Sequence, residues 1–315
     1  MVVEPEISVI INNYNYGPML PRAIESALGQ TGVRAEVVVV DDGSTDDSAA
    51  VIKGYGDRIR PVFQRNGGQA SAINAGVAAA RAPALAFLDA DDWWLPGKLA
   101  AVVAALAAAP EAGLVYHRLQ PVYSDGSVAF APIPRSLCAG NLAPRLARSG
   151  GRWPFPMTSS LTVRRSAWAA AGAIPEGFRI SADAWLTGII PLLAPVVALP
   201  QPLGFYRIHN NAWYRARDDR AMLVKRMRHW RATVEVSNRF LARRGRAERL
   251  ALSDHFWFQA ALARLGDPDA PGALRLLLLG LGDPGEPSLL RRLRDSLRAV
   301  AALRQPLPDA AEEGA

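Results

Sequence analysis

A pattern that recurs four times in the first third of the chain constrains the fold most strongly. In each case a short strand pattern leads into a polar loop and then into a helical pattern. The strand patterns are the runs at residues 7–11, 36–40, 60–64 and 85–88, and the third is weaker than the others. Strands and helices that alternate over short loops predict right-handed crossovers and a parallel, doubly wound sheet. Successive parallel strands end on the same side, so the polar loops converge at one edge, where such folds bind ligands.

The fourth run ends in a group of carboxylates, Asp89-Ala90-Asp91-Asp92. Acids this close repel one another in a partly desolvated cleft unless a hard cation shares the site. The grouping therefore predicts Mg²⁺ or Mn²⁺ and a substrate that carries phosphate. A second interpretation stays open, in which Asp92 caps the helix that begins near Pro96 and the other two acids are solvated loop residues.

Three further loops carry distinctive polar residues. Asn-Asn-Tyr-Asn follows the first run at residues 12–15, and Asp-Asp-Gly-Ser-Thr-Asp follows the second at residues 41–46. A helix led by glycine spans residues 68–76, as Gly-Gln-Ala-Ser-Ala-Ile-Asn-Ala-Gly. Each motif alone is weak, but all of them occur here in one order with regular spacing.

Together these motifs resemble the family 2 inverting glycosyltransferases of the GT-A fold, over residues 7–210. The resemblance implies an α/β chain with a Rossmann-like, mostly parallel nucleotide-binding sheet, a mixed C-terminal part and then a helical extension. It also implies transfer of a sugar from a nucleoside-diphosphate sugar, most often a UDP-sugar, to a hydroxyl of a saccharide, glycolipid or protein acceptor. Mg²⁺ or Mn²⁺ is the implied cofactor.

The resemblance assigns residues to the nucleotide sugar. Tyr14 matches the position that stacks on the base, and Asn12 the position that contacts base or ribose. Asp42 matches the acid that accepts the uracil N3 proton, while Asp41 is either a partner or only a turn residue. Gln69 opens the glycine-led helix beside the same pocket, and it is expected to contact the donor.

The metal site implied by the resemblance centres on Asp91. Asp89 or Asp92 is expected to contact the ribose or to complete the shell of the ion; we assign Asp89 to the nucleotide sugar and Asp92 to the metal. His209 matches a late histidine that reaches the metal or diphosphate in some members. A purely structural histidine after a strand is the alternative.

The implied catalytic base is Asp183, with Trp185 two residues later. A carboxylate can take the proton that an acceptor hydroxyl loses as it attacks the sugar. The alternative is an ordinary aspartate that the helix dipole favours in a first turn. Two departures from the family pattern are Ala182, where a Glu is frequent, and Ile73, where many members carry Arg. Phosphate contacts could then come from elsewhere, for example from Arg65 or Arg207.

Beyond the fifth strand, expected at residues 113–118, the pattern becomes mixed. Further strands are expected at residues 157–163, 196–199 and 203–208, and only helical patterns follow. Trp93 and Trp94 either line the sugar pocket or fill the end of the sheet. The expected domains are a GT-A domain at 1–212, made of a nucleotide-sugar half (1–118) and an acceptor half (119–212), a helical extension at 213–304 and a disordered tail at 305–315.

Composition limits the class of protein. Half of the residues are apolar and charges are plentiful, which fits a globular chain with a large core. Cys138 is the only cysteine, which excludes an internal disulfide and fits a reducing compartment. No leader peptide or membrane span is visible, so we expect a cytoplasmic protein, peripheral at the inner face of the membrane if it contacts lipid, and we expect no nucleic-acid partner.

The net charge of +7 is concentrated in residues 207–264, and the rest of the chain is nearly neutral. Near the end, leucines at 290, 293 and 297 fall on one side of a helix with arginines beside them. This basic amphipathic pattern predicts either peripheral contact with a membrane or packing on the catalytic domain.

A hypothesis from another class remains at this stage. A non-catalytic nucleotide-sugar-binding or scaffold protein could keep the donor pocket, and Ala182 and Ile73 are the residues that favour it. A nucleotidyltransferase is less favoured, because the chain lacks a glycine-rich basic loop after its first strand.

Overall fold

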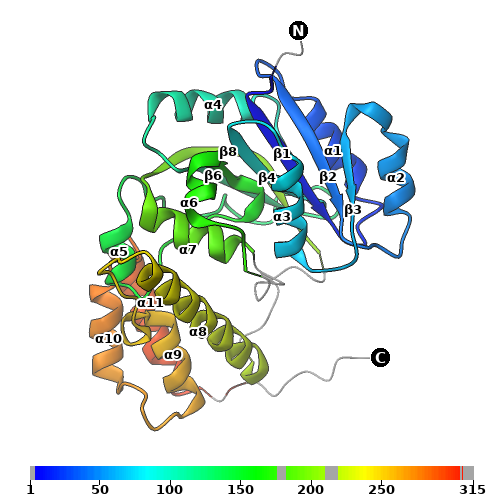
Figure 1. The fold of residues 1–315 in the computed structure, drawn as a ribbon. Helices are drawn as coiled ribbons and strands as arrows, with labels where there is room; N and C mark the ends of the chain where they lie inside the picture. The colour runs from blue at the N-terminus through cyan, green and yellow to red at the C-terminus, as the bar shows by residue number, and fades with distance from the viewer. Residues whose placement is uncertain (1–3, 176–181, 210–218, 306, 308–315) are drawn as a thin grey trace. The chain divides into compact units, whose positions relative to one another are not determined.

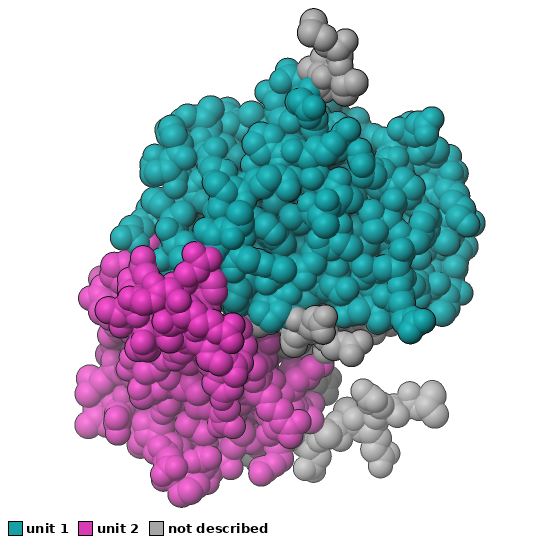
Figure 2. All heavy atoms as spheres, in the orientation of Figure 1, with its two compact units in different colours: residues 1–141, 155–209 teal, residues 142–154, 210–315 magenta. Residues whose placement is uncertain are grey.

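The computed structural model describes residues 4–175, 182–209, 219–305 and 307. Contacts between residues divide the chain into two compact units (Figure 2). Unit 1 comprises residues 1–141 and 155–209, and unit 2 comprises residues 142–154 and 210–315. No helix among the described residues has the length and apolar character needed to cross a bilayer.

Unit 1 is built on a mixed eight-stranded sheet (Figure 1). The strand order is β3-β2-β1-β4-β7-β6-β8-β5. The strands are β1 (Ile7–Asn13), β2 (Ala35–Asp41), β3 (Arg60–Phe63), β4 (Ala84–Asp89), β5 (Trp93–Trp94), β6 (Leu114–Tyr123), β7 (Leu161–Arg164) and β8 (Val196–Ile208).

Strands β1 to β4 form the predicted parallel half of the sheet. β1 pairs in parallel with β2 on one side and β4 on the other, and β2 pairs in parallel with β3. β7 then runs antiparallel to both β4 and β6, and β6 pairs in parallel with β8. The expected fold class, a Rossmann-like sheet with a mixed second part, is therefore confirmed.

Helices cover both faces of the sheet. They are α1 (Leu20–Leu28), α2 (Ser48–Gly54), α3 (Gln69–Ala79), α4 (Lys98–Ala108), α6 (Arg165–Ala171) and α7 (Asp183–Leu193). One large apolar cluster joins alternate residues of the parallel strands to α1, α2 and α4. The other set of strand residues faces α3, where Gly76 lies so close to Ile10 that a Cβ atom would collide with it. The alternation along each strand thus gives the sheet two apolar faces.

Two local predictions in the second half of the sheet were wrong. Residues 158–160, expected to be in a strand, form a 3₁₀ turn, because the hydroxyl groups of this segment make local and tertiary hydrogen bonds. The two short strands expected at 196–199 and 203–208 are one strand, β8, whose register against β6 shifts near Arg118. That irregularity accommodates Pro200 and Pro202, which lack the N–H that a regular ladder uses.

Unit 2 is helical, as expected for the C-terminal extension. Its helices are α5 (Ala143–Ala147), α8 (Arg220–Arg243), α9 (Phe256–Leu265), α10 (Ala273–Gly282) and α11 (Leu289–Ala302). Its apolar core gathers Phe256, Ala260, Leu276 and Ala299. Residues 142–154, which lie in the predicted acceptor half, group with these helices. The predicted tail at 305–315 falls almost entirely outside the described residues.

Candidate active site

The carboxyl ends of β1 and β4 bring the first site residues together. Asn12 and Asp89 are neighbours in the parallel register, and Asn12 Nδ2 donates to Asp89 Oδ1 at 3.0 Å. Gln69 Nε2, from the first residue of α3, donates to the same oxygen at 3.0 Å. Two amides thus hold one side of this carboxylate, and Asp89 Oδ2 has no hydrogen-bond partner among the described residues.

The loop after β2 is organised by its two acids. Asp42 is buried, and its Oδ1 accepts hydrogen bonds from Gln64 Nε2 at 2.6 Å and from the Gly67 amide at 2.9 Å. Its Oδ2 accepts from the Gly68 amide at 2.7 Å. Asp41 accepts from Asn13 and Ser44, so it holds the turn itself. The sequence left open whether Asp41 is a partner of Asp42 or a turn residue. Its hydrogen bonds to Asn13 and Ser44 fit a turn residue.

The loop after β1 presents an aromatic ring. The side chain of Tyr14 is 45% exposed. The loop beneath it is tied to the β2 loop, since Asn15 Oδ1 accepts from the Thr45 amide at 2.7 Å and the Asn15 amide donates to Ser44 Oγ at 2.9 Å. Asn15 has a φ of 59°, a left-handed conformation that asparagine tolerates better than most residues. Tyr14 therefore sits on a fixed loop with its ring open to a ligand.

The pKa values of Asp89 and Asp92 are raised by burial and by neighbouring acids. The pKa of Asp89 rises to about 7 because of burial, the charge of Asp91 and, less strongly, the charge of Asp183. Burial, Asp91 and Asp89 also raise the pKa of Asp92 well above its usual value. The negative charge also affects Tyr16. Its pKa rises to about 12, mainly because of burial and then because of the charges of Asp91, Asp89 and Asp92. Negative charge is concentrated here, as the sequence predicts.

Asp91 and Asp92 differ in their surroundings. Asp91 Oδ2 lies 2.8 Å from His209 Nε2, and the Asp91 carbonyl accepts from Arg207 Nε at 2.9 Å. Both oxygens of the buried Asp92 are engaged by the protein: Oδ2 accepts from the Ser159 hydroxyl at 2.6 Å and Oδ1 from the Arg207 amide at 2.9 Å. These contacts make Asp91 the better placed of the two for an ion, and give Asp92 a role in joining the loop to β8.

Asp183 comes from a distant part of the chain but lies within electrostatic range of Asp89. It is the first residue of α7, and the preceding residues 176–181 lie outside the described part. The amide of Ala182 donates to Gln69 Oε1 at 3.1 Å. Gln69 therefore bridges Asp89 and the start of α7. The structure brings the predicted base and the predicted donor residues to one place.

An ion would find mixed ligands here. The Asp91 carboxylate and the His209 imidazole offer one oxygen and one nitrogen, a pair that suits Mn²⁺ and that Mg²⁺ tolerates less well. Within the described residues, no group of three or more His, Cys, Asp or Glu side chains is arranged to hold an ion unaided. The remaining ligands would then be phosphate oxygens and water, as is common for metal ions at phosphate-transfer sites.

Ser159 and Arg22 were not predicted to contribute, whereas Trp93 and Trp94 were expected either to line the sugar pocket or to fill the end of the sheet. Ser159 also accepts a hydrogen bond from the Asp89 amide at 3.1 Å, but it lay in a segment expected to be a strand. Trp94 Nε1 donates to the Ser159 carbonyl at 2.7 Å. Trp93 stacks on Phe205, and the guanidinium of Arg22 lies 3.4 Å from its ring centre. Both tryptophans are buried, so they fill the sheet end and support the acidic loop.

Comparison with known proteins places the chain in a family. The model of glycosyl transferase family 2 matches residues 8–150. An uncharacterised glycosyltransferase of Nostoc sp. (strain PCC 7120) is 37% identical over 261 residues, which cover 81% of each chain. The chain belongs to glycosyl transferase family 2. A second relative of this family 2 glycosyltransferase, the succinoglycan biosynthesis protein ExoU of Rhizobium meliloti, is 34% identical over 165 residues and 46% of each chain.

Solved structures support the fold of the family 2 enzyme. TarS of S. aureus, in complex with UDP-GlcNAc, superposes with a TM-score of 0.57 at 18% identity, covering 94% of this chain and 90% of TarS. The mannosyltransferase PcManGT of Pyrobaculum calidifontis, in complex with GDP-Man and Mn²⁺, gives a TM-score of 0.52 at 19% identity and covers 96% of this chain and 75% of its own. The likeness shows the GT-A fold.

Proposed function

We propose that this glycosyltransferase moves a sugar from a nucleoside-diphosphate sugar, with UDP-sugars as the first candidates, to a hydroxyl of a saccharide, glycolipid or protein acceptor. Transfer would be a single displacement with inversion, with Asp183 as base and a divalent cation as cofactor. The observation that carries this proposal is Gln69, which joins Asp89 to the start of the helix that bears Asp183. The named relative ExoU makes polysaccharide or glycoconjugate biosynthesis the natural setting.

The donor would occupy the loops after β1, β2 and β4. The exposed ring of Tyr14 offers a stacking surface to the base. Asp42 accepts three hydrogen bonds from the protein, which leaves one of roughly four lone-pair directions of a carboxylate for an N–H of the base. An ionised carboxylate only accepts, so this position selects a base with a donor at that edge, as uracil has at N3. Asp89 Oδ2 is available for ribose hydroxyls.

The acceptor oxygen would attack the anomeric carbon while the bond between that carbon and the diphosphate oxygen breaks. Asp183 takes the hydroxyl proton, and the electron pair of the broken bond leaves with the diphosphate. A divalent cation bound here would supply positive charge to offset the negative charge on the leaving diphosphate. Asp91 and His209 are the side chains that would hold it, and Asp92, whose oxygens both accept hydrogen bonds from the protein, would support the loop instead of ligating directly.

A donor screen with Asp183→Asn tests the proposal. Wild-type protein is incubated with UDP- and GDP-sugars, Mn²⁺ and saccharide acceptors, and nucleoside diphosphate release is measured. We expect kcat to fall by roughly 10²- to 10⁴-fold in the variant, because general base catalysis contributes about that much. UDP affinity should change little, and Asp125→Asn in an exposed turn of unit 1 serves as control.

The same assay decides the second hypothesis. If wild type and Asp183→Asn bind UDP and release it from the donor equally slowly, Asp183 is not the base and the donor pocket serves binding alone. If pyrophosphate is released in place of nucleoside diphosphate, the protein is a nucleotidyltransferase and the displacement proposed here is wrong.

A further inference from the structure

Helix α11 presents its leucines to solvent. Leu289, Leu290, Leu293 and Leu297 are 72%, 80%, 45% and 52% exposed. The residues of α11 that are buried are Ser296 and Ala299. An amphipathic helix of a globular unit ordinarily turns its apolar side inward. In α11 the apolar side faces outward instead. Exposed leucines that lie next to one another are typical of a surface that binds a partner.

Close packing against α10 fixes this orientation. A Cβ atom on Gly280 would lie 2.6 Å from the ring of Phe256 and would also collide with the Ser296 hydroxyl. Beside Gly280 the contact between α10 and α11 therefore accepts only a small side chain, and a leucine in place of Ser296 would not fit there. Ser296 satisfies its hydroxyl by donating to the Arg292 carbonyl at 2.6 Å. Ser296 and Ala299 therefore face the core of unit 2, and the four leucines of α11 face the solvent.

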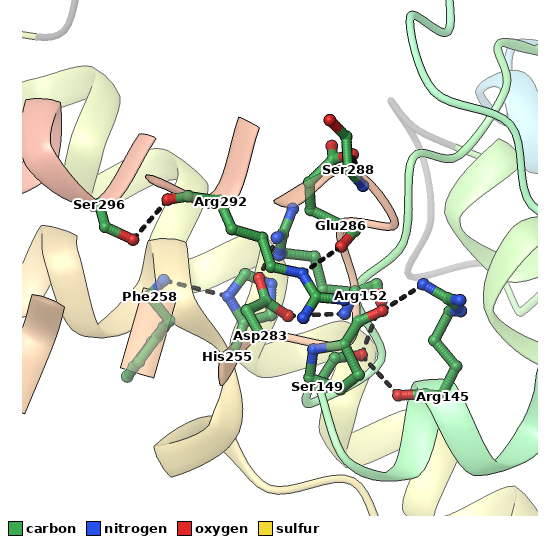
Figure 3. Close-up of polar contacts among 12 residues, drawn as sticks. Arg145, Ser149, Arg152, His255, Phe258, Asp283, Glu286, Ser288, Arg292 and Ser296 are labelled. Atoms are coloured by element: carbon green, nitrogen blue, oxygen red, sulfur yellow. Dashed lines mark hydrogen bonds and ion pairs between the residues drawn. The ribbon is translucent and has the colours of Figure 1, made fainter. Parts of the chain in front are cut away.

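A polar network at the start of α11 holds the same rotation (Figure 3). Arg292 Nε donates to the Glu286 carbonyl at 2.6 Å, and Glu286 Oε1 accepts from the Ser288 amide at 2.9 Å. Ser288 Oγ in turn accepts from the Arg291 amide and caps the helix. Arg292 is thus part of this hydrogen-bond network. A rotation of α11 that buried its leucines would break these hydrogen bonds.

Charge identifies what would cover the leucines. Arg291, Arg294 and Arg298 lie beside them, and the only acid of the helix, Asp295, pairs with Arg294. Two copies of this face would bring arginines against arginines, which disfavours self-association. A surface that takes leucine side chains and carries negative charge around them fits better. The interface of an anionic lipid bilayer has both properties.

We propose that α11 is a membrane-surface helix, which lies in the plane of an anionic bilayer with its leucines among the acyl chains and its arginines among the headgroups. Leu274 and Leu278 on α10 are also exposed, at 70% and 58%. The inference concerns where the enzyme works and is independent of its donor and base.

Vesicle co-sedimentation of the full chain tests this inference. Vesicles of phosphatidylcholine alone are compared with vesicles that also contain phosphatidylglycerol. We expect pelleting with the anionic vesicles, and a partition coefficient lower by about tenfold or more in Leu293→Gln/Leu297→Gln, because buried methylene groups are lost. Arg291→Gln/Arg298→Gln should lose about as much. Glutamine keeps helix propensity close to that of leucine and arginine.

The matched control is Arg239→Gln/Arg243→Gln, which removes the same charge from exposed positions of α8. We expect it to pellet like the wild type. Circular dichroism must show that all variants melt as the wild type does, since the altered side chains are exposed. Equal pelleting of the leucine variant and the wild type contradicts the proposal. So does a dimer in light scattering that the leucine substitutions abolish, because a second copy would then be the partner.

Discussion

The carboxylate of Asp91 and the imidazole of His209 are the pair on which metal use would depend. If they hold the cation, His209→Ala should raise the Mn²⁺ concentration for half-maximal activity by roughly 10- to 100-fold, with full activity recovered at saturating Mn²⁺. EDTA should abolish activity in both proteins, and Mn²⁺ should restore it. His229→Ala on α8 is the control. An unchanged Mn²⁺ requirement in His209→Ala would assign the histidine a structural role.

Tyr14 offers a separate test of the base pocket. Loss of one base–aromatic stack costs about 1–3 kcal/mol, so Tyr14→Leu should weaken UDP binding by about tenfold or more. Isothermal titration calorimetry measures this directly. Tyr123→Leu removes a ring of similar exposure at the end of β6 and should leave UDP binding as it is. Equal affinities of the Tyr14 variant and the wild type would place the base elsewhere.

The sequence predicted these residues for a physical reason. Parallel strands deliver their loops to one edge, so Asn12, Asp42 and Asp89 could be grouped without coordinates. The contacts of Asp92 could not be foreseen, because they depend on Ser159 and Arg207, which approach from the mixed half of the sheet. Ser159 does not stand out in the hydrophobic pattern of the sequence, and the residues around it were expected to form a strand. Local patterns thus specify the loops after β1, β2 and β4, whereas tertiary contacts decide which of the acids already have hydrogen-bond partners.

The contact between α10 and α11 is sensitive to side-chain size at Gly280. Gly280→Ala should lower the free energy of unfolding of unit 2 by about 1–3 kcal/mol, because the added Cβ collides with Phe256 and Ser296. Gly282→Ala in the same helix meets nothing within 4 Å, so it should be neutral or slightly stabilising. Urea unfolding monitored by circular dichroism measures both. Equal midpoints would mean that the helices can separate at no cost.

The helices and parallel strands were predicted better than the connections between the two units. In the first third of the chain, apolar strand patterns alternate with helical patterns, and this predicts β1 to β4 and the helices between them. The strands are apolar because the sheet is buried on both faces. The grouping of residues 142–154 with the C-terminal helices has no such periodic signature. It rests on particular contacts, such as the ion pair of Arg152 with Asp283 and the bond from Arg145 to the Pro284 carbonyl (Figure 3).

Across the whole molecule, buried groups respond to pH with opposite signs. His117 in β6 and His255 at the start of α9 have pKa values lowered to about 3, chiefly by burial. Between about pH 3 and about 6.5 these histidines bind more protons in the unfolded chain than in the folded one. Their contribution to the free energy of unfolding is therefore complete above about pH 6.5 and is lost as the pH falls. Asp89 and Asp92, whose pKa values are raised, act the other way: their contribution falls as the pH rises from about 4 through their folded-state values.

A variant isolates one of these groups. His255 Nδ1 accepts from the Phe258 amide at 3.0 Å, and Asn is a good capping residue that does not titrate. Relative to the wild type, His255→Asn should gain about 1 kcal/mol of stability for each pH unit below pH 6.5. Urea unfolding between about pH 7.5 and 5 gives the difference. A difference that does not change with pH would show that His255 titrates alike in folded and unfolded chains.

The chain crosses between its two units more than once. It leaves unit 1 after residue 141, returns at residue 155 and leaves again after residue 209. During synthesis on the ribosome, the strands β7 and β8 therefore emerge before the helices that residues 142–154 need. Until Asp283 has been made, the nascent chain carries Arg152 without its acid. A shortened chain that stops at residue 212 would leave Arg152 permanently without that acid, and it would still contain residues 142–154 of unit 2, so a single cut does not separate the two units.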